Sequence, residues 1–276
     1  MSRFWNSRTR EITPYVPGEQ PRDRAFIKLN TNECPYPPAP AVARTLREMD
    51  AETLRLYPDP VSLRLREALS AYYGFPVEQT FVGNGSDEVL ALAFQAFFEP
   101  APTGQAISFP DITYSFYPVY AALYGIPCRT VPLEEGFAVP IEALAAPSGG
   151  IALANPNAPT GRAVGRADIE RLAAADPGRV VIIDEAYVDF GGESALPLLD
   201  TYENLLVVMT FSKSRALAGA RLGFAIGSRE LIEGLERVRD SFNSYPVDRV
   251  AELVGIAALS DGAWFEQNRA RIIATR

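Results

Sequence analysis

The sequence contains no histidine and only two cysteines, Cys34 and Cys128. Without histidine the chain has no Ser-His-Asp or Cys-His nucleophile and no histidine-ligated zinc site. The two cysteines lie far apart and form no CxxC pattern, so we expect reduced thiols, as in a cytoplasmic protein, and no metal centre. Any chemistry must therefore come from lysine, tyrosine, aspartate, arginine or a bound cofactor.

Long apolar runs and an excess of positive charge are also lacking. The longest apolar runs, such as Leu205–Met209 and Val89–Phe98, are too short or too interrupted to span a bilayer. Residues Met1–Arg10 are polar and arginine-rich, without the apolar core of a signal peptide. The net charge of −8 disfavours nucleic acid as a partner. We therefore expect a cytoplasmic protein, bound to no membrane, that acts on small molecules.

Short apolar runs alternate with helical patterns along most of the 276 residues. Such runs are typical of strands buried on both faces of a parallel sheet. The expected strands include residues 106–109, 151–154, 180–183, 205–209 and 222–226, and the expected helices include 86–98, 117–124 and 166–175. Ser62 and Ser86 are expected to cap helices, and Met1–Ile27 to form an irregular arm. The predicted fold is α/β, with a doubly wound, mostly parallel sheet and helices on both faces.

Polar segments follow four of the predicted strands, at the edge where open α/β sheets bind their ligands. Lys213 follows the run 205–209, and a partly desolvated amine there suits Schiff-base chemistry. Asp184 ends the run 180–183, where a buried carboxylate needs a partner such as a protonated pyridine nitrogen. Tyr187 and Asn157 could donate to a phenolic oxygen of the same cofactor. Taken singly, each residue also fits a structural role, as a surface lysine, a salt bridge or a half-buried aromatic.

The same edge carries groups that suit an anion. Gly85–Asp87 lies at the start of a predicted helix, where backbone N–H groups and the helix dipole favour negative charge. A simple turn and helix cap explains this glycine loop equally well. Thr210 and Ser212 add hydroxyl groups. Arg221 follows Lys213 closely and opens the next strand, so it can return to the pocket as a charge-assisted donor.

Five segments, in collinear order, resemble the motifs of a known family. Residues 210–213 (Thr-Phe-Ser-Lys), with Arg221, resemble the lysine motif of class-II-type aminotransferases with the aspartate aminotransferase fold. Residues 155–161 resemble their NPNNPTG loop and residues 183–187 their DEAY segment. Residues 29–35 look like the LNxNExP opening of histidinol-phosphate aminotransferases, with Cys34 in place of the usual asparagine, and residues 56–59 look like their RYPD segment.

This resemblance covers nearly the whole chain and implies a type I transferase fold that depends on pyridoxal phosphate (PLP). Lys213 would hold PLP as a Schiff base and then move a proton between the donor Cα and the cofactor. Asp184 would pair with the pyridine nitrogen, Asn157 and Tyr187 would bind the phenolic oxygen, and Tyr114 would stack on the ring. The resemblance assigns the phosphate to Gly85, Ser86, Asp87, Thr210, Ser212 and Arg221.

The resemblance also implies a homodimer with shared active sites, because the tyrosine that Tyr57 matches reaches the partner's cofactor phosphate. Tyr15 and Asn32 match, more weakly, residues near the substrate. Ala158 replaces the second asparagine of the loop, a change that we expect to be tolerated.

We expect residues 1–50 to form an arm and part of a small domain, 51–235 the large PLP-binding domain, and 236–276 an interdomain helix and the start of the small domain. The helical pattern still runs at Arg276, whereas the family continues with a strand and a substrate-binding arginine. We therefore expect the second, small domain to be incomplete and the activity to be impaired.

The leading hypothesis is transfer of an amino group from L-histidinol phosphate to 2-oxoglutarate, giving imidazole acetol phosphate and L-glutamate in histidine biosynthesis. The alternatives within the fold are a transaminase for aromatic or other amino acids and a threonine-phosphate decarboxylase. A shortened chain that binds PLP with little or no turnover is another alternative. A nucleotide-binding protein is disfavoured, since the chain has neither a GxGxxG loop nor a Walker lysine.

Overall fold

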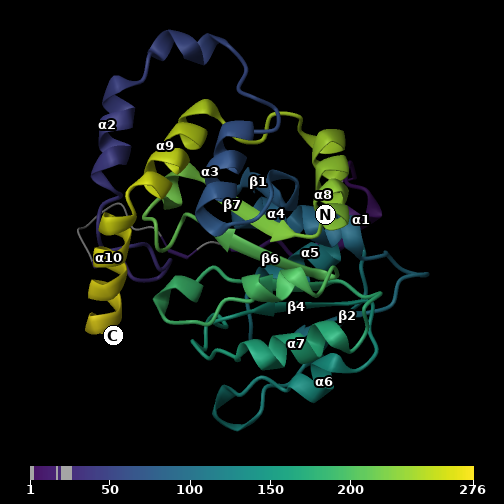
Figure 1. Ribbon diagram of the computed structural model, residues 1–276. Coiled ribbons are helices and arrows are strands. Elements are labelled where there is room, and N and C mark those ends of the chain that lie inside the picture. Colours follow the sequence, from purple (N-terminus) through teal and green to yellow (C-terminus); the bar gives the residue numbers. More distant parts are fainter. Residues whose placement is uncertain (1–2, 17, 20–26) are drawn as a thin grey trace.

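The computed structural model describes residues 3–16, 18–19 and 27–276. Its centre is a seven-stranded sheet in the order β1-β7-β6-β5-β4-β2-β3 (Figure 1). The strands are β1 (Thr80–Asn84), β2 (Ile107–Pro110), β3 (Cys128–Val131), β4 (Gly150–Ala154), β5 (Val181–Asp184), β6 (Leu205–Thr210) and β7 (Leu222–Gly227). Strand β7 pairs antiparallel with β1 and β6, and the other pairs are parallel. The predicted mostly parallel sheet is confirmed.

Helices cover both faces because successive strand residues point to opposite sides of the sheet. In β4, Ile151 and Leu153 belong to one core cluster, whereas Ala152 and Ala154 belong to the other. The first cluster includes residues of α2 (Pro40–Glu48), α3 (Leu63–Tyr73), α6 (Ile141–Ala145), α7 (Arg166–Ala174) and α9 (Arg249–Ser260). The second includes residues of α4 (Gly85–Phe97), α5 (Phe116–Tyr124) and α8 (Arg229–Phe242). The sheet is thus doubly wound, as predicted.

The remaining helices are α1 (Ser7–Glu11), α10 (Gly262–Thr275) and the 3₁₀ turns η1 (Ala51–Arg55), η2 (Val77–Gln79), η3 (Glu135–Phe137), η4 (Val188–Phe190), η5 (Leu196–Asp200) and η6 (Ala218–Ala220). Helix α10 contacts η4, which follows β5. Among the described residues, no helix is both long and apolar enough to cross a membrane.

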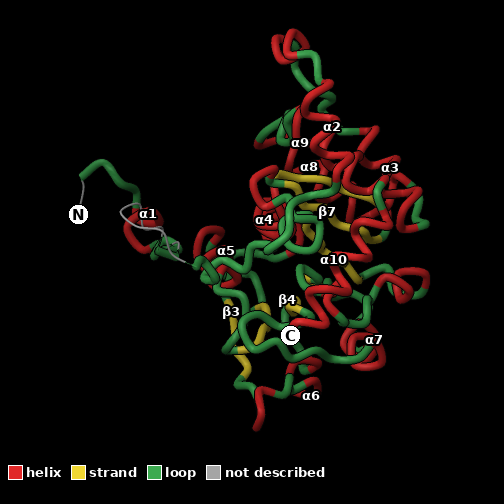
Figure 2. The backbone as a smooth tube through the Cα atoms, turned by 90° about the vertical axis from the view of Figure 1, so that its left-hand side faces the viewer, coloured by secondary structure: helices red, strands yellow, loops and turns green. Residues whose placement is uncertain are grey.

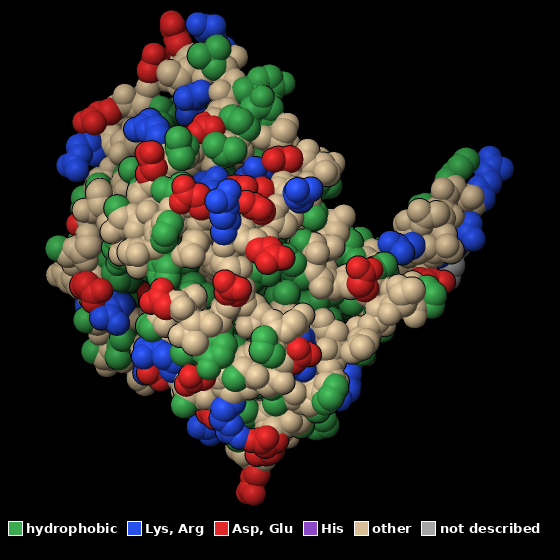
Figure 3. Space-filling view, turned by 45° about the vertical axis from the view of Figure 1, so that its right-hand side comes forward, with side chains coloured by type: hydrophobic (Ala, Val, Ile, Leu, Met, Phe, Trp, Pro, Cys, Tyr) green, Lys and Arg blue, Asp and Glu red, His purple; other side chains and the backbone are tan. Residues whose placement is uncertain are grey.

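The N-terminal arm differs from the prediction of an irregular segment. Its residues Ser7–Glu11 form α1, because the Asn6 side chain accepts a hydrogen bond from the Thr9 backbone N–H at 2.8 Å and caps the helix. The arm stands off from the body beside α5 (Figure 2), and the space-filling view shows it projecting from the surface (Figure 3). Residues 1–2, 17 and 20–26 of this arm lie outside the described residues.

Edge strand β3 was not expected from the sequence. Three of its four residues are exposed and only Val131 is buried, so it forms no apolar run. It joins the sheet through parallel pairing with β2, which a hydropathy pattern does not report.

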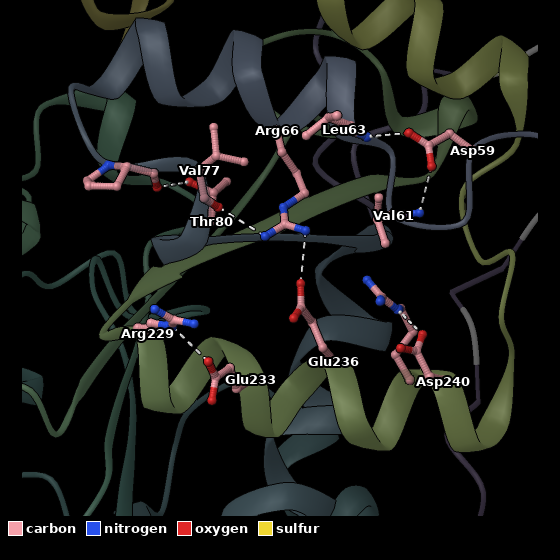
Figure 4. A network of polar contacts seen from close by, with 12 residues as sticks. Asp59, Val61, Leu63, Arg66, Val77, Thr80, Arg229, Glu233, Glu236 and Asp240 are labelled. Carbon is pink, nitrogen blue, oxygen red and sulfur yellow. Dashed lines mark hydrogen bonds and ion pairs between the residues drawn. The ribbon is translucent and has the colours of Figure 1, made fainter.

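Ser62 stands at the N-cap position of α3, as predicted, but its side chain makes no capping hydrogen bond, and the predicted cap at Ser86 is wrong. Ser62 precedes α3, but the carboxylate of Asp59 accepts the hydrogen bond from the Leu63 N–H at 2.8 Å (Figure 4). Ser86 lies inside the first turn of α4, which begins one residue earlier. The Glu88 carboxylate accepts a hydrogen bond from the Asn84 N–H at 2.6 Å. A side chain of the first turn of α4 therefore pairs with the backbone N–H of the N-cap residue.

The buried Arg66 side chain connects helices of the two layers at the β1 edge of the sheet. The Arg66 guanidinium lies 2.9 Å from the Glu236 carboxylate of α8 and donates to the Val77 carbonyl at 3.0 Å (Figure 4). The side chain of Arg66 is 9% exposed, so this pair is shielded from solvent. The sheet edge beside β1 is therefore closed by side chains from both layers.

Candidate active site

A cavity of about 120 Å³ opens at the carboxyl ends of β4, β5 and β6. This is the position where open α/β sheets bind ligands. Most of the residues that the sequence predicted for cofactor binding line this cavity: Ser86, Asp87, Tyr114, Asp184, Tyr187, Thr210, Ser212, Lys213 and Arg221. They come from segments far apart in the sequence, and the sheet topology brings them together.

Lys213 lies in the loop after β6, under the segment that resembles the LNxNExP opening. Its Nζ donates to the Thr31 carbonyl at 2.9 Å and lies 5.5 Å from the centre of the Tyr187 ring. The Asn32 side chain donates to the Tyr187 hydroxyl at 3.0 Å, with a positive φ of 51° at Asn32. The opening segment thus covers the lysine and contacts its neighbour directly.

Asp184, at the end of β5, is 4% exposed. One carboxylate oxygen accepts the Ala186 N–H at 3.1 Å, and the other accepts the Tyr117 hydroxyl at 3.2 Å. Burial raises the pKa of Asp184 to about 6, and these two hydrogen bonds oppose the rise. No lysine or arginine of the described chain forms an ion pair with Asp184. The buried carboxylate therefore retains free lone pairs at the cavity.

Arg221 and Asp87 also line the cavity, and the Arg221 guanidinium lies 2.9 Å from one carboxylate oxygen of Asp87. The Tyr114 hydroxyl donates to the other oxygen at 2.6 Å. Arg221 has a left-handed backbone, with φ of 51°, directly before β7. This conformation turns the side chain back over the start of α4.

Two glycines allow the start of α4 to approach this arginine and β7. Gly85 has a φ of +81°, and a Cβ there would lie 2.5 Å from the Arg221 guanidinium. A Cβ on Gly223 would lie 2.2 Å from the Ser86 backbone nitrogen. The first turn of α4, the guanidinium and the hydroxyls of Ser86 and Ser212 therefore surround a small polar cradle. The Thr210 hydroxyl also lines it, while donating to the Leu222 carbonyl at 3.3 Å.

Asn157, Tyr15 and Tyr57 do not line this small cavity, although Asn157 lines a larger cavity beside it. The Asn157 side chain is 2% exposed, and its amide hydrogens go to the Ile112 carbonyl and the Thr160 hydroxyl, both at 2.9 Å. Tyr15 packs on Phe116, with ring centroids 4.4 Å apart. Tyr57 is 78% exposed and stacks on Tyr245 at 4.6 Å, away from this cavity. The cofactor and substrate roles of these residues stay predictions.

A larger cavity of about 480 Å³ lies beside the first and shares Lys213 and Tyr187 with it. Asn32, Cys34 and Arg276 also line this space. It joins the lysine to the outside of the molecule, so a molecule larger than the first cavity can reach the amine.

The sequence interpretation missed two contacts at the site. The Thr31 carbonyl accepts from Lys213, and the Tyr117 hydroxyl donates to Asp184. The sequence interpretation selected Tyr114, three residues before Tyr117, but no sequence pattern reports which tyrosine hydroxyl turns toward the carboxylate. The sequence also cannot show which backbone carbonyl accepts from Lys213, because every residue has one.

Comparison with known proteins agrees with this geometry. A family model described as aminotransferase class I and II matches residues 24–276. The histidinol-phosphate aminotransferase of Chromohalobacter salexigens is 60% identical over 276 residues, which cover 100% of this chain and 78% of that protein. The protein of the same name from Clostridium acetobutylicum is 51% identical with the same coverage. The chain belongs to the histidinol-phosphate aminotransferases, within the class I and II aminotransferase family.

Solved structures confirm the family fold. Histidinol-phosphate aminotransferase from Sinorhizobium meliloti, in complex with pyridoxal-5'-phosphate, matches with a TM-score of 0.79 and 26% identity, covering 88% of this chain and 66% of that one. An aspartate aminotransferase mutant from Thermus thermophilus matches with a TM-score of 0.82 and 23% identity, covering 98% of this chain and 76% of that one. The expected aspartate aminotransferase fold is thus confirmed.

Proposed function

We propose that this chain is a PLP-dependent aminotransferase that moves the amino group of L-histidinol phosphate to 2-oxoglutarate, giving imidazole acetol phosphate and L-glutamate. The observation that carries the proposal is one cavity shared by Lys213, a buried carboxylate with no ion-pair partner among the described residues, and an arginine-lined cradle. The names of the relatives at 51–60% identity supply the amino donor and the role in histidine biosynthesis.

The residues of the small cavity fit PLP. Asp184 would hold the pyridine nitrogen in its protonated form, because a buried carboxylate is stabilised by a cation within hydrogen-bond reach. Arg221 and the first turn of α4 would hold the phosphate in place of the present Asp87 ion pair. Tyr114 would lie against the ring, and Tyr187 would donate to its phenolic oxygen. The left-handed backbone at Gly85, with a φ of +81°, favours glycine at the point where the first turn of α4 approaches Arg221.

Lys213 would carry the reactive amine. When bound, PLP supplies an electron sink for the electrons released at the donor Cα. The Lys213 Nζ would take the proton from the donor Cα and deliver it to the cofactor. The Thr31 carbonyl, now 2.9 Å away, holds the amine within the cavity until it is engaged. The larger cavity beside Lys213 would hold the donor, with Asn32 at its wall.

We also propose a homodimer in the cytoplasm, with Tyr57 serving the partner's cofactor phosphate. Exposed apolar side chains support an interface near this tyrosine: Leu54 is 54% exposed, Leu56 52% and Phe242 76%. In this proposal residues 51–235 form the cofactor domain, 1–50 the arm and part of the small domain, and 236–276 the interdomain helix and the start of the small domain.

The decisive test is whether PLP attaches to Lys213. The sequence contains one other lysine, Lys28, whose Nζ lies 2.8 Å from the Glu33 carboxylate as an ion pair. We expect the chain with PLP to show a visible absorbance band that is lost in Lys213→Ala and retained in Lys28→Ala. Borohydride reduction followed by peptide mass spectrometry should place the modification on Lys213.

Addition of L-histidinol phosphate should then bleach the visible band of the wild-type chain, with return of the band when 2-oxoglutarate is added. Turnover retained in Lys213→Ala, or modification at Lys28 alone, would overturn the assignment. A band that responds to an aromatic amino acid but not to L-histidinol phosphate would keep the cofactor and reject the donor.

A further inference from the structure

Tyr117 lies behind Asp184, at the side of the carboxylate that faces α5. Its hydroxyl donates to Asp184 at 3.2 Å, and both side chains are almost fully buried. We propose that Tyr117 is a positioning residue, which orients the Asp184 carboxylate and keeps it ionised for a cationic partner in the cavity. The proposal rests on the proposed function, because that function supplies the partner.

The two hydrogen bonds to Asp184 fix the plane of its carboxylate. One oxygen is held by the Ala186 N–H and the other by the Tyr117 hydroxyl. A carboxylate oxygen has two acceptor positions, so each oxygen keeps one for another donor. Rotation of the carboxylate would break at least one of the two bonds. Loss of the Tyr117 hydroxyl would leave the second oxygen free to turn away from the cavity.

The Tyr117 ring is held firmly enough to aim its hydroxyl. It is fully buried in an aromatic cluster, with its centroid 6.0 Å from Phe94, 5.9 Å from Phe109 and 5.7 Å from Tyr114. Edge-to-face and stacked contacts of this kind restrict a ring within a packed core. The direction of the hydroxyl is therefore set by the core and does not depend on a ligand.

The protonation of both groups supports the same role. Burial, followed by the nearby Asp184 charge, raises the pKa of Tyr117 well above its ordinary value, so the phenol remains a donor. The hydrogen bond from Tyr117 lowers the pKa of Asp184 against the larger effect of burial. Removal of this hydroxyl would therefore shift the carboxyl toward its neutral form, which pairs poorly with a protonated pyridine nitrogen.

The chain offers a matched control in Tyr120, one turn further along α5. Tyr120 is 4% exposed and lies in the same aromatic cluster, 5.5 Å from Phe94, but its buried hydroxyl has no hydrogen-bond partner among the residues that the structure describes. Tyr117→Phe and Tyr120→Phe each remove one buried hydroxyl and keep the ring. Only the first removes a hydrogen bond to Asp184.

We expect Tyr117→Phe to lower kcat about tenfold, the size of effect that loss of a hydrogen bond to a charged group produces. With PLP isotope-labelled at its ring nitrogen, the nitrogen resonance should move toward the unprotonated position. In the cofactor-free protein at neutral pH, the labelled Asp184 carboxyl carbon, assigned by its loss in Asp184→Asn, should move toward the protonated position. Tyr120→Phe should leave all three measurements at the wild-type values.

Unchanged nitrogen and carboxyl resonances in Tyr117→Phe would overturn the proposal, and so would equal shifts in Tyr120→Phe, which would indicate a general loosening of the core. The carboxyl measurement needs no cofactor. If the wild-type protein formed no lysine-linked PLP, the proposed function would fail. The carboxyl resonance of Asp184 would still test the effect of Tyr117.

Discussion

Asp184 and Glu185 are consecutive carboxylates with opposite surroundings. Both are buried, at 4% and 2% exposure, and burial raises the pKa of Asp184 to about 6 and that of Glu185 to about 7. Asp184 lines the small cavity and keeps acceptor positions free. Glu185 accepts from the Ser194 hydroxyl at 2.7 Å and from the Ala195 N–H at 2.6 Å, and it does not line that cavity. A shifted pKa alone therefore does not identify the functional carboxylate.

Successive side chains of a strand point to opposite faces of the sheet, so Asp184 and Glu185 point in opposite directions at the end of β5. Asp184 turns toward Tyr117, which belongs to the core cluster under α4, α5 and α8. Glu185 turns toward Ala195, which belongs to the cluster on the other face. Asp184 is therefore available to a ligand in the cavity, whereas Glu185 holds the loop after η4 through its two hydrogen bonds. We therefore expect Asp184 to contribute mainly to catalysis and Glu185 mainly to stability.

Of the two carboxylates, Asp184 should have the larger effect on catalysis, tested by Asp184→Ala. We expect the variant to fold and to retain some PLP, but kcat should fall by about 10²–10³, as when one preorganised electrostatic contact is removed from an active site. Steady-state rates with L-histidinol phosphate, together with circular dichroism and the PLP content, measure this. An unchanged rate would eliminate the assigned role of Asp184.

Glu185→Ala should show the reverse pattern. The change leaves the buried Ala195 N–H and the Ser194 hydroxyl without their acceptor, which should lower the free energy of unfolding by about 1–3 kcal/mol. We expect kcat of the folded variant to stay within a few-fold of wild type. Urea unfolding and the same rate assay separate the two quantities. If Glu185→Ala lost activity as Asp184→Ala does, with stability retained, the distinction between the carboxylates would be wrong.

The sequence predicted the central part of this arrangement. Short apolar runs indicated β4, β5 and β6 because these strands are buried on both faces, and the resemblance of residues 183–187 to the DEAY segment selected Asp184 over Glu185. Exposed β3 gave no apolar signal. Neither Ser62, which is at the N-cap of α3, nor Ser86 makes a capping hydrogen bond, because Asp59 and Glu88 take part in the hydrogen bonds there. Side-chain direction depends on packing between distant segments, which local patterns do not report.

The position of Tyr57 illustrates another limit of the sequence. The motif resemblance assigns it to a site shared between subunits, whereas within one chain it stacks on Tyr245 and its carbonyl accepts from the Arg249 guanidinium at 2.9 Å. A role in a partner's site is decided by an interface, so neither the pattern nor the fold of one chain determines it.

The pH dependence of unfolding also separates the two carboxyls. A carboxyl with a higher pKa in the folded state binds its proton more tightly there than in the unfolded chain, so stability falls as pH rises between the two pKa values. For Glu185 this window runs from its ordinary value of 4.5 to about 7, and for Asp184 from 3.8 to about 6. The non-titrating variants Glu185→Gln and Asp184→Asn lack the respective loss.

Urea unfolding of the cofactor-free proteins across this range should therefore show wild type losing stability relative to each variant as pH rises. The difference from Asp184→Asn should become constant near pH 6 and the difference from Glu185→Gln near pH 7, as the folded-state pKa values require. Only the change with pH is diagnostic, because each substitution also alters hydrogen bonds at every pH. A wild-type advantage that grew with pH would mean that the carboxyl is ionised more easily in the folded state, and the burial argument for that residue would fail.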